Sequence, residues 1–129
     1  MPPVKRFFTT FALIISPFAS AYSQQSTAVP QYQCMGLKAL WNGEGPMPPP
    51  VDEYTGPTPA ATPAGIASAT LIVDDPLTVI DGRVRVIRPN GQLVWIDRSQ
   101  ITPWHVVSNP NAVCSVIMLP NGTLQTTSH

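Results

Sequence analysis

GRVRVIRPNGQLVWIDRSQITPW, residues Gly82–Trp104, decides the expected fold, because apolar and polar side chains alternate on either side of a tight turn. Val84 and Val86 would face one way, and Arg83 and Arg85 would face the other. Valines facing inward and arginines facing outward are typical of a half-buried antiparallel strand. The stretch therefore predicts one strand of an antiparallel sheet.

The turn within this stretch, Pro89–Gly91, has the chemistry of a β-hairpin. Proline fixes φ at about −65° in the second turn position, and Asn90 tolerates the bridge region that follows. Gly91 can adopt the left-handed conformation that such a turn needs. We therefore expect Leu93–Ile96 to return antiparallel to the first strand.

A second hairpin is expected at Pro120–Gly122, where the same three residue types recur between Ala112–Leu119 and Thr123–Thr126. Cys34–Trp41 fits either a first strand or a helical turn. Further strands are expected where apolar runs are bounded by turn residues, and these runs lie in Ile66–Val73, Leu77–Ile80 and Ile101–Val107. Five or six short strands without an amphipathic helix predict a small all-β barrel or sandwich.

The segment from Asn42 to Gly65 is rich in proline. Seven of the sixteen prolines lie between Pro46 and Pro63. Because proline lacks a backbone N–H and blocks helices, we expect no regular element here. This Pro-rich loop, 42–65, is either an ordered connection across the surface or a mobile lid.

The first residues have the pattern of a secretory signal peptide. Lys5 and Arg6 precede the apolar stretch Phe7–Phe18, which is shorter than the roughly 20 residues that span a bilayer. The small residues Ala19–Ala21 would form the cleavage site. We therefore expect a signal peptide over 1–21 and an exported protein, periplasmic or extracellular and not membrane-spanning; the alternatives are a membrane anchor or a core helix.

After cleavage, 108 residues would remain, enough for one small domain. We expect the polar run 22–33 to be a disordered arm and 34–129 to form the domain. With five basic and seven acidic residues, this part lacks the basic footprint of a nucleic-acid-binding protein. Most of the acids precede the arginines along the chain, so they would pair across strands; a charged docking face is the alternative.

Cys34 and Cys114 are expected to form a disulfide bond. They are the two cysteines of the chain, and an isolated pair in an oxidising compartment is usually bridged. A redox pair or a metal site is the alternative. The cysteines form no Cys-x-x-Cys motif, and no histidine lies at ligand spacing, so the structural bridge is favoured.

The segments Gly82–Val86 and Arg88–Ile96, followed by Ile101, resemble the bacterial SH3-like domain. The resemblance consists of a glycine, a Val-x-Val strand, a hairpin glycine at Gly91, a Trp-aliphatic pair at Trp95 and a later aliphatic residue. Val94 departs from the family, which prefers glycine there. The family's early Asn-Val-Arg segment is absent, and the chain from Asn109 lies outside its pattern.

The resemblance implies a half-open barrel of five to six antiparallel strands, over which the Pro-rich loop would lie. It also implies a binding module, because exported members of this family commonly bind peptidoglycan or cell-wall peptides. The expected partners are therefore a peptide, peptidoglycan or an envelope protein.

Catalytic machinery is not expected. The two histidines are His105 and the terminal His129, and no nucleophile-base motif or metal-binding motif occurs. Asp74 and Asp75 are adjacent, so on a strand they would point to opposite faces; a turn cap explains them better than a cation site. We expect a non-enzymatic protein without a metal or another cofactor.

Aromatic residues are the best candidates for ligand contact, because tryptophan and tyrosine supply a large, stiff contact area. The candidates are Trp104, Tyr54, Trp41 and His105. Trp41 and Tyr54 flank the Pro-rich loop, and they could instead stack on its prolines. Trp95 lies between aliphatic residues and is expected to be half-buried in the core.

Two main hypotheses follow, and a small hydrolase or metal-binding protein is a weaker third. In the first, an exported SH3-like module binds a peptide or cell-wall component in a groove near Trp104, Tyr54 and the Pro-rich loop. In the second, the same fold is an accessory subunit that docks on an envelope protein through an exposed apolar patch.

Overall fold

The computed structural model describes residues 25–40 and 43–129. The expected signal peptide, 1–21, and the candidate Trp41 lie outside this part. A short 3-10 turn, η1, occupies Arg98–Gln100. The strands are β1 Thr27–Ala28, β2 Tyr32–Leu37, β3 Asp52–Tyr54, β4 Pro63–Ile66, β5 Thr70–Asp74, β6 Val79–Ile80, β7 Arg83–Ile87, β8 Leu93–Asp97, β9 Ile101–Pro103, β10 Cys114–Met118 and β11 Leu124–Ser128.

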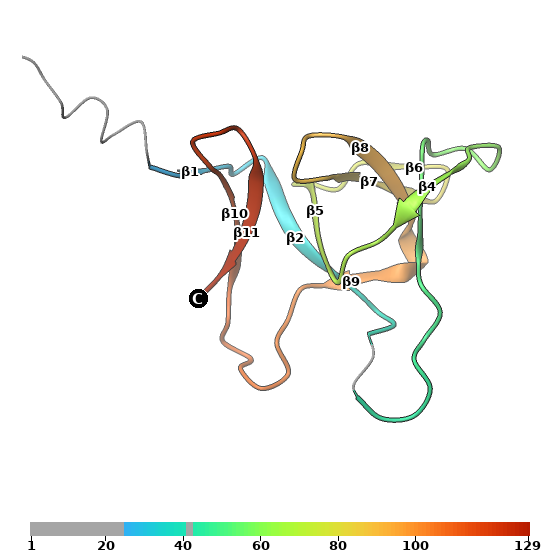
Figure 1. Ribbon diagram of the computed structural model, residues 1–129, viewed down its shortest axis with the longest axis horizontal. Helices are drawn as coiled ribbons and strands as arrows, with labels where there is room; N and C mark the ends of the chain where they lie inside the picture. The colour runs from blue at the N-terminus through green and yellow to red at the C-terminus, as the bar shows by residue number, and fades with distance from the viewer. Residues whose placement is uncertain (1–24, 41–42) are drawn as a thin grey trace, which may run out of the picture.

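The strands form two antiparallel sheets, which lie beside each other in Figure 1. The small sheet has the order β1-β10-β11. The large sheet has the order β4-β3-β8-β7-β5-β2-β9, and β6 pairs with β7 beside it. The expectation of an all-β antiparallel fold is thus confirmed, with more and shorter strands than the sequence indicated. The described strands form no closed barrel.

The large sheet curls around a first hydrophobic core. Ile101 comes from the edge strand β9, whereas Ile96 comes from β8 near the opposite edge, yet both belong to one cluster. The three-residue turn η1 joins β8 directly to β9, so the sheet must bend back on itself to bring these two strands together. The buried members of this first core are Leu37, Leu71, Val73, Val84, Val86, Val94, Ile96 and Ile101.

A second core joins the outer face of the large sheet to the small sheet. Its buried members come from both sheets and are Val29, Cys34, Ile72, Ile87, Val116 and Leu124. Because side chains alternate along a strand, Ile72 points away from its neighbours Leu71 and Val73, which belong to the first core. β5 and β7 are therefore buried on both faces.

We expected Arg83–Ile87 to be a half-buried strand with its arginines in water, but β7 is buried on both faces. Val84 and Val86 do face the first core, but Ile87 on the other face is only 3 % exposed and Arg83 only 9 %. The small sheet covers Ile87. Arg83 lies beneath the Tyr54 ring, with its guanidinium carbon 3.6 Å from the ring centre.

Both hairpin turns are confirmed. Gly91 has φ +88°, and its N–H donates to the Arg88 carbonyl oxygen over 2.8 Å. The Asn90 side chain accepts a hydrogen bond from the Gln92 N–H, which fixes the turn further. Gly122 has φ +85° in the equivalent turn between β10 and β11.

The Cys34–Cys114 disulfide is also confirmed. It joins β2 of the large sheet to β10 of the small sheet, with the two Cα atoms 6.0 Å apart. A hydrogen bond from the Leu124 N–H to the Pro89 carbonyl oxygen, 2.9 Å long, ties the small sheet to the β7–β8 turn. The two sheets are therefore joined by a covalent bond, a backbone hydrogen bond and the second core.

Two expected irregular segments contain strands. The described part of the arm 22–33 includes β1 and the start of β2, because Val29 is buried in the second core and its N–H donates to Val116. The Pro-rich loop, 42–65, contains β3 and the first residues of β4. These strands are possible because the prolines largely avoid positions inside them, and Pro63 begins the edge strand β4.

Two other boundaries differ from expectation. The start of the expected run 34–41 forms a strand rather than a helical turn, and β2 begins two residues before the run and ends at Leu37. β9 ends at Pro103, because proline has no N–H to continue the ladder, so the expected strand through Val107 is short. The terminal His129 is hydrogen-bonded to Val113 through both its N–H and its carbonyl oxygen.

Acidic and basic residues pair across strands, as the charge pattern indicates. Each arginine of the β7 region donates to a carboxylate on another strand, and the pairs are Arg83–Asp97, Arg85–Asp74 and Arg88–Glu53. Burial alone would raise the pKa of Asp74. Hydrogen bonds from Arg85 and Thr78 and the charge of Arg85 outweigh burial, so this pKa lies below its ordinary value of 3.8.

Replacing both cysteines by alanine should lower the free energy of unfolding by about 4 kcal/mol, because the bridge closes a loop between residues 80 apart and restricts the unfolded chain. Urea unfolding of the oxidised protein and of the Cys34→Ala/Cys114→Ala variant measures this difference. Equal unfolding midpoints for the two proteins would contradict the assignment.

Asp74→Asn should lower the free energy of unfolding by about 1 kcal/mol near neutral pH. A depressed pKa stabilises the folded state only above the unfolded value, so this contribution disappears as the pH falls below 3.8 and through the folded pKa. Urea unfolding at neutral and acidic pH should show the two proteins converging in acid. A difference that stays constant with pH would contradict the depressed pKa.

Candidate functional site

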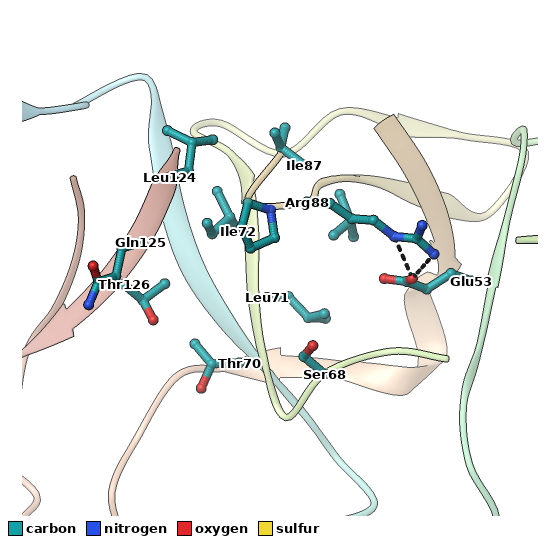
Figure 2. A pocket seen from close by; sticks show the side chains of 12 residues that line it. Glu53, Ser68, Thr70, Leu71, Ile72, Ile87, Arg88, Leu124, Gln125 and Thr126 are labelled. Carbon is teal, nitrogen blue, oxygen red and sulfur yellow. Dashed lines mark hydrogen bonds and ion pairs between the residues drawn. The ribbon is translucent and has the colours of Figure 1, made fainter. Parts of the chain in front are cut away.

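A cavity opens where β5 and β7 separate. β5 pairs with β2 over five residues, and β7 pairs with β8 over five, yet β5 and β7 share only the pair Val73–Val86. Toward the start of β5 and the end of β7, the two strands diverge. The space beside them, extending to β11, is a cavity of about 220 Å³, which we call the inter-sheet cavity (Figure 2).

The inter-sheet cavity has an apolar floor and a polar rim. The apolar residues belong to both cores and are Leu71, Ile72, Val86, Ile87 and Leu124. The remaining residues, mostly polar, are Glu53, Ser68, Thr70, Arg88, Pro89, Gln125 and Thr126. An apolar cavity bordered by a few convergent polar groups is the usual form of a small ligand site.

A buried ion pair forms the wall opposite β11, as Figure 2 shows. Glu53 is only 4 % exposed, and its Oε1 accepts hydrogen bonds from both Nε and Nη2 of Arg88. Arg88 Nη2 also donates to the Ala64 carbonyl oxygen, and Nη1 donates to Gln92. Among the described residues, no hydrogen bond reaches the second carboxylate oxygen of Glu53, Oε2.

Gly65 makes room for this ion pair. It lies opposite Glu53 in the β3–β4 pairing, beside a register shift between Glu53 and Tyr54. A Cβ atom on Gly65 would lie 2.6 Å from Arg88 Nη2, and the residue has φ +150°, which side chains disfavour. Glycine is therefore required where β4 passes the guanidinium group.

Tyr54 holds a structural position. Its ring covers the Arg83 guanidinium, an arrangement that is attractive because the ring face is electronegative. Arg83 also donates to Asp97 and to the carbonyl oxygens of Gly56 and Thr58. The Pro-rich loop is thus fixed by an arginine that binds its backbone, and the Tyr54 ring covers the same arginine.

The other aromatic candidates lie elsewhere. Trp104 packs against the second core and, with His105, borders a hollow beside Leu40 and Thr102. His105 is exposed, and its Nδ1 lies 3.1 Å from the Pro103 carbonyl oxygen. Tyr54 lines a different hollow, so the structure does not bring Tyr54 and Trp104 into one groove. Trp95 is half-buried, as expected.

Sequence reasoning missed the residues of the inter-sheet cavity. Glu53 and Arg88 are 35 positions apart, and their contact depends on how the Pro-rich loop returns to the sheet. The available signal was an acid, Glu53, beside Tyr54 and within a segment otherwise rich in proline, which could have suggested an internal partner.

Comparisons of the chain with protein-family models, with curated proteins and with solved structures found no match. Within residues 25–40 and 43–129, no group of three or more His, Cys, Asp and Glu side chains is placed to hold a metal ion. In the same part of the chain, no helix has the length and apolar character needed to cross a membrane.

Gly65→Ala should lower the free energy of unfolding by about 2 kcal/mol, because the new methyl group displaces Arg88 from Glu53 and strains the backbone. Gly122→Ala is the matched control: it also has a positive φ, but no atom lies within 4 Å of the added methyl group. Thermal unfolding should therefore show the larger loss for Gly65→Ala. Equal losses in the two variants would contradict the steric explanation.

Proposed function

We propose that this protein is a non-enzymatic exported binding module with an SH3-like fold, and that it recognises a peptide, from a partner protein or from the cell wall, in the inter-sheet cavity. The resemblance of Gly82–Ile96 to SH3-like domains supports the fold. The curled antiparallel sheet and the Val-x-Val hairpin agree with that resemblance.

The inter-sheet cavity is the observation that carries the proposal. Its volume of about 220 Å³ suits one or two side chains rather than a large cofactor. The Glu53–Arg88 ion pair and the disulfide-linked small sheet hold its walls apart, so the cavity is formed before a ligand arrives. A preformed site lowers the entropic cost of binding.

A peptide suits this cavity better than a charged small molecule. Glu53 and Arg88 are its charged residues and their charges cancel, so the lining attracts neither anions nor cations strongly. The rim offers hydroxyl and amide groups, which hydrogen-bond to the backbone and polar side chains of a peptide. The disulfide agrees with an exported protein, because such bonds persist in oxidising compartments.

A filled cavity should abolish binding. Thr126→Trp places a large ring in the inter-sheet cavity, whereas Thr127→Trp adds the same ring on the opposite face of β11. The mature protein and both variants would be screened against a random-heptapeptide display library and sedimented with purified peptidoglycan. Circular dichroism melting would establish that all three are folded.

We expect the mature protein and Thr127→Trp to bind, and Thr126→Trp to bind at least about tenfold more weakly. Sedimentation with peptidoglycan would identify the wall as the source of the peptide. Failure of the mature protein to bind either probe, or equal binding by the two variants, would contradict the proposal. In a pull-down from envelope extract, capture of one envelope protein by both the mature protein and Thr126→Trp would contradict binding in the cavity and would favour an accessory subunit instead.

A further inference from the structure

We propose that the peptide binds as an added strand along the free edge of β11, with one side chain directed across the inter-sheet cavity toward Glu53. This inference rests on the proposed function and specifies how the ligand is held. Three features support it: the hydrogen-bonding direction of β11, the position of β5 and the Glu53 oxygen that has no partner among the described residues.

β11 is an edge strand, because it ends the order β1-β10-β11. Its backbone groups alternate in direction, as in every antiparallel pair. The Leu119 N–H donates to the Thr123 carbonyl oxygen, and His129 exchanges two hydrogen bonds with Val113. Odd-numbered residues of β11 therefore point their backbone groups toward β10, and Leu124, Thr126 and Ser128 point theirs away from it.

One of these outward-facing backbone groups already makes a hydrogen bond of the kind that an added strand would make with Thr126 and Ser128. The Leu124 N–H donates to the Pro89 carbonyl oxygen over 2.9 Å. The N–H and carbonyl groups of Thr126 and Ser128 continue along the same edge. Edge strands with unpaired groups are the surfaces to which extended peptides add in strand-addition complexes.

The opposite side of the cavity is bordered by the start of β5. The Leu37 N–H donates to the Ala69 carbonyl oxygen, and the Asp75 N–H donates to the Gln31 carbonyl oxygen, so the odd-numbered residues of this segment face β2. Thr70 therefore directs its backbone groups away from β2, beyond the Val73–Val86 pair at which β5 still meets β7. Thr70 lines the inter-sheet cavity together with Thr126. An extended segment along β11 would thus lie beside the start of β5, with its regular hydrogen bonds made to β11.

Glu53 determines the side chain that the site prefers. Its Oε2 is a buried hydrogen-bond acceptor without a partner among the described residues, and such a group favours a donor. Because Arg88 already neutralises the carboxylate, a neutral donor fits better than a second cation. Figure 2 shows Glu53 across the cavity from β11, so the donor must be on a long side chain. We therefore assign a long side chain with a neutral donor, such as glutamine, to this position of the peptide.

Amide hydrogen exchange by NMR tests the added strand. A heptapeptide selected from the random library should slow exchange of the Thr126 and Ser128 amides by at least about tenfold. The amides of Gln125 and Thr127, which already face β10, serve as internal references and should change little. Protection elsewhere, with Thr126 and Ser128 unchanged, would overturn the strand assignment while leaving a peptide-binding function in place. The absence of any selected peptide would overturn both.

N-methylation of the peptide gives an independent test that leaves the protein unaltered. Methylating one amide at a time should weaken binding at alternate positions, because only every second N–H of the peptide faces β11. Weaker binding at every second methylated position supports strand addition. Equal weakening at all positions, or no weakening at any position, overturns it.

Substitutions in the peptide and in Glu53, made separately and together, test the contact between the peptide glutamine and Glu53. Replacing the peptide glutamine with methionine should weaken binding to the mature protein by about tenfold and should have a much smaller effect on the Glu53→Gln variant. Equal losses against both proteins, or selected peptides that carry no glutamine or related donor, would overturn the role of Glu53.

Discussion

Burial of β5 and β7 on both faces is the constraint on which the rest of the structure depends. One face of each strand packs into the curled sheet, and the other packs against β10 and β11 through Ile72 and Ile87. A strand covered on both sides has no face left for free charges, so the arginines near β7 are each paired with a carboxylate. The disulfide and the Leu124–Pro89 hydrogen bond then fix the small sheet in place.

The cavity lies where this two-sided packing is incomplete. β5 and β7 are paired only at Val73 and Val86, and beyond that pair Ile72 and Ile87 line the space that extends to β11. The gap is bordered by a buried ion pair on one side and a free strand edge on the other. The apolar surface, the unpaired Glu53 oxygen and the open edge of β11, all within the described residues, are the features on which the proposed peptide site rests.

Features encoded within a few residues could be predicted from the sequence. The two Pro-Asn-Gly turns specify their own hairpins. The disulfide was also predictable, although its cysteines are 80 positions apart, because the chain contains one possible pair. Features that depend on distant packing could not be predicted. Alternation in Arg83–Ile87 indicates two faces, but nothing local shows that a later hairpin covers the second one. The contact of Glu53 with Arg88 required the path of the Pro-rich loop, which proline content alone does not determine.

The two sheets must unfold together if the second core joins them. Native-state hydrogen exchange tests this directly, by comparing the Val86 amide in β7 with the Ile117 amide in β10 as urea is added. If the second core joins the sheets, both amides should have the same opening free energy and the same dependence on urea. An Ile117 amide that opens at a much lower free energy than Val86 would show that the small sheet unfolds separately, and would contradict the account.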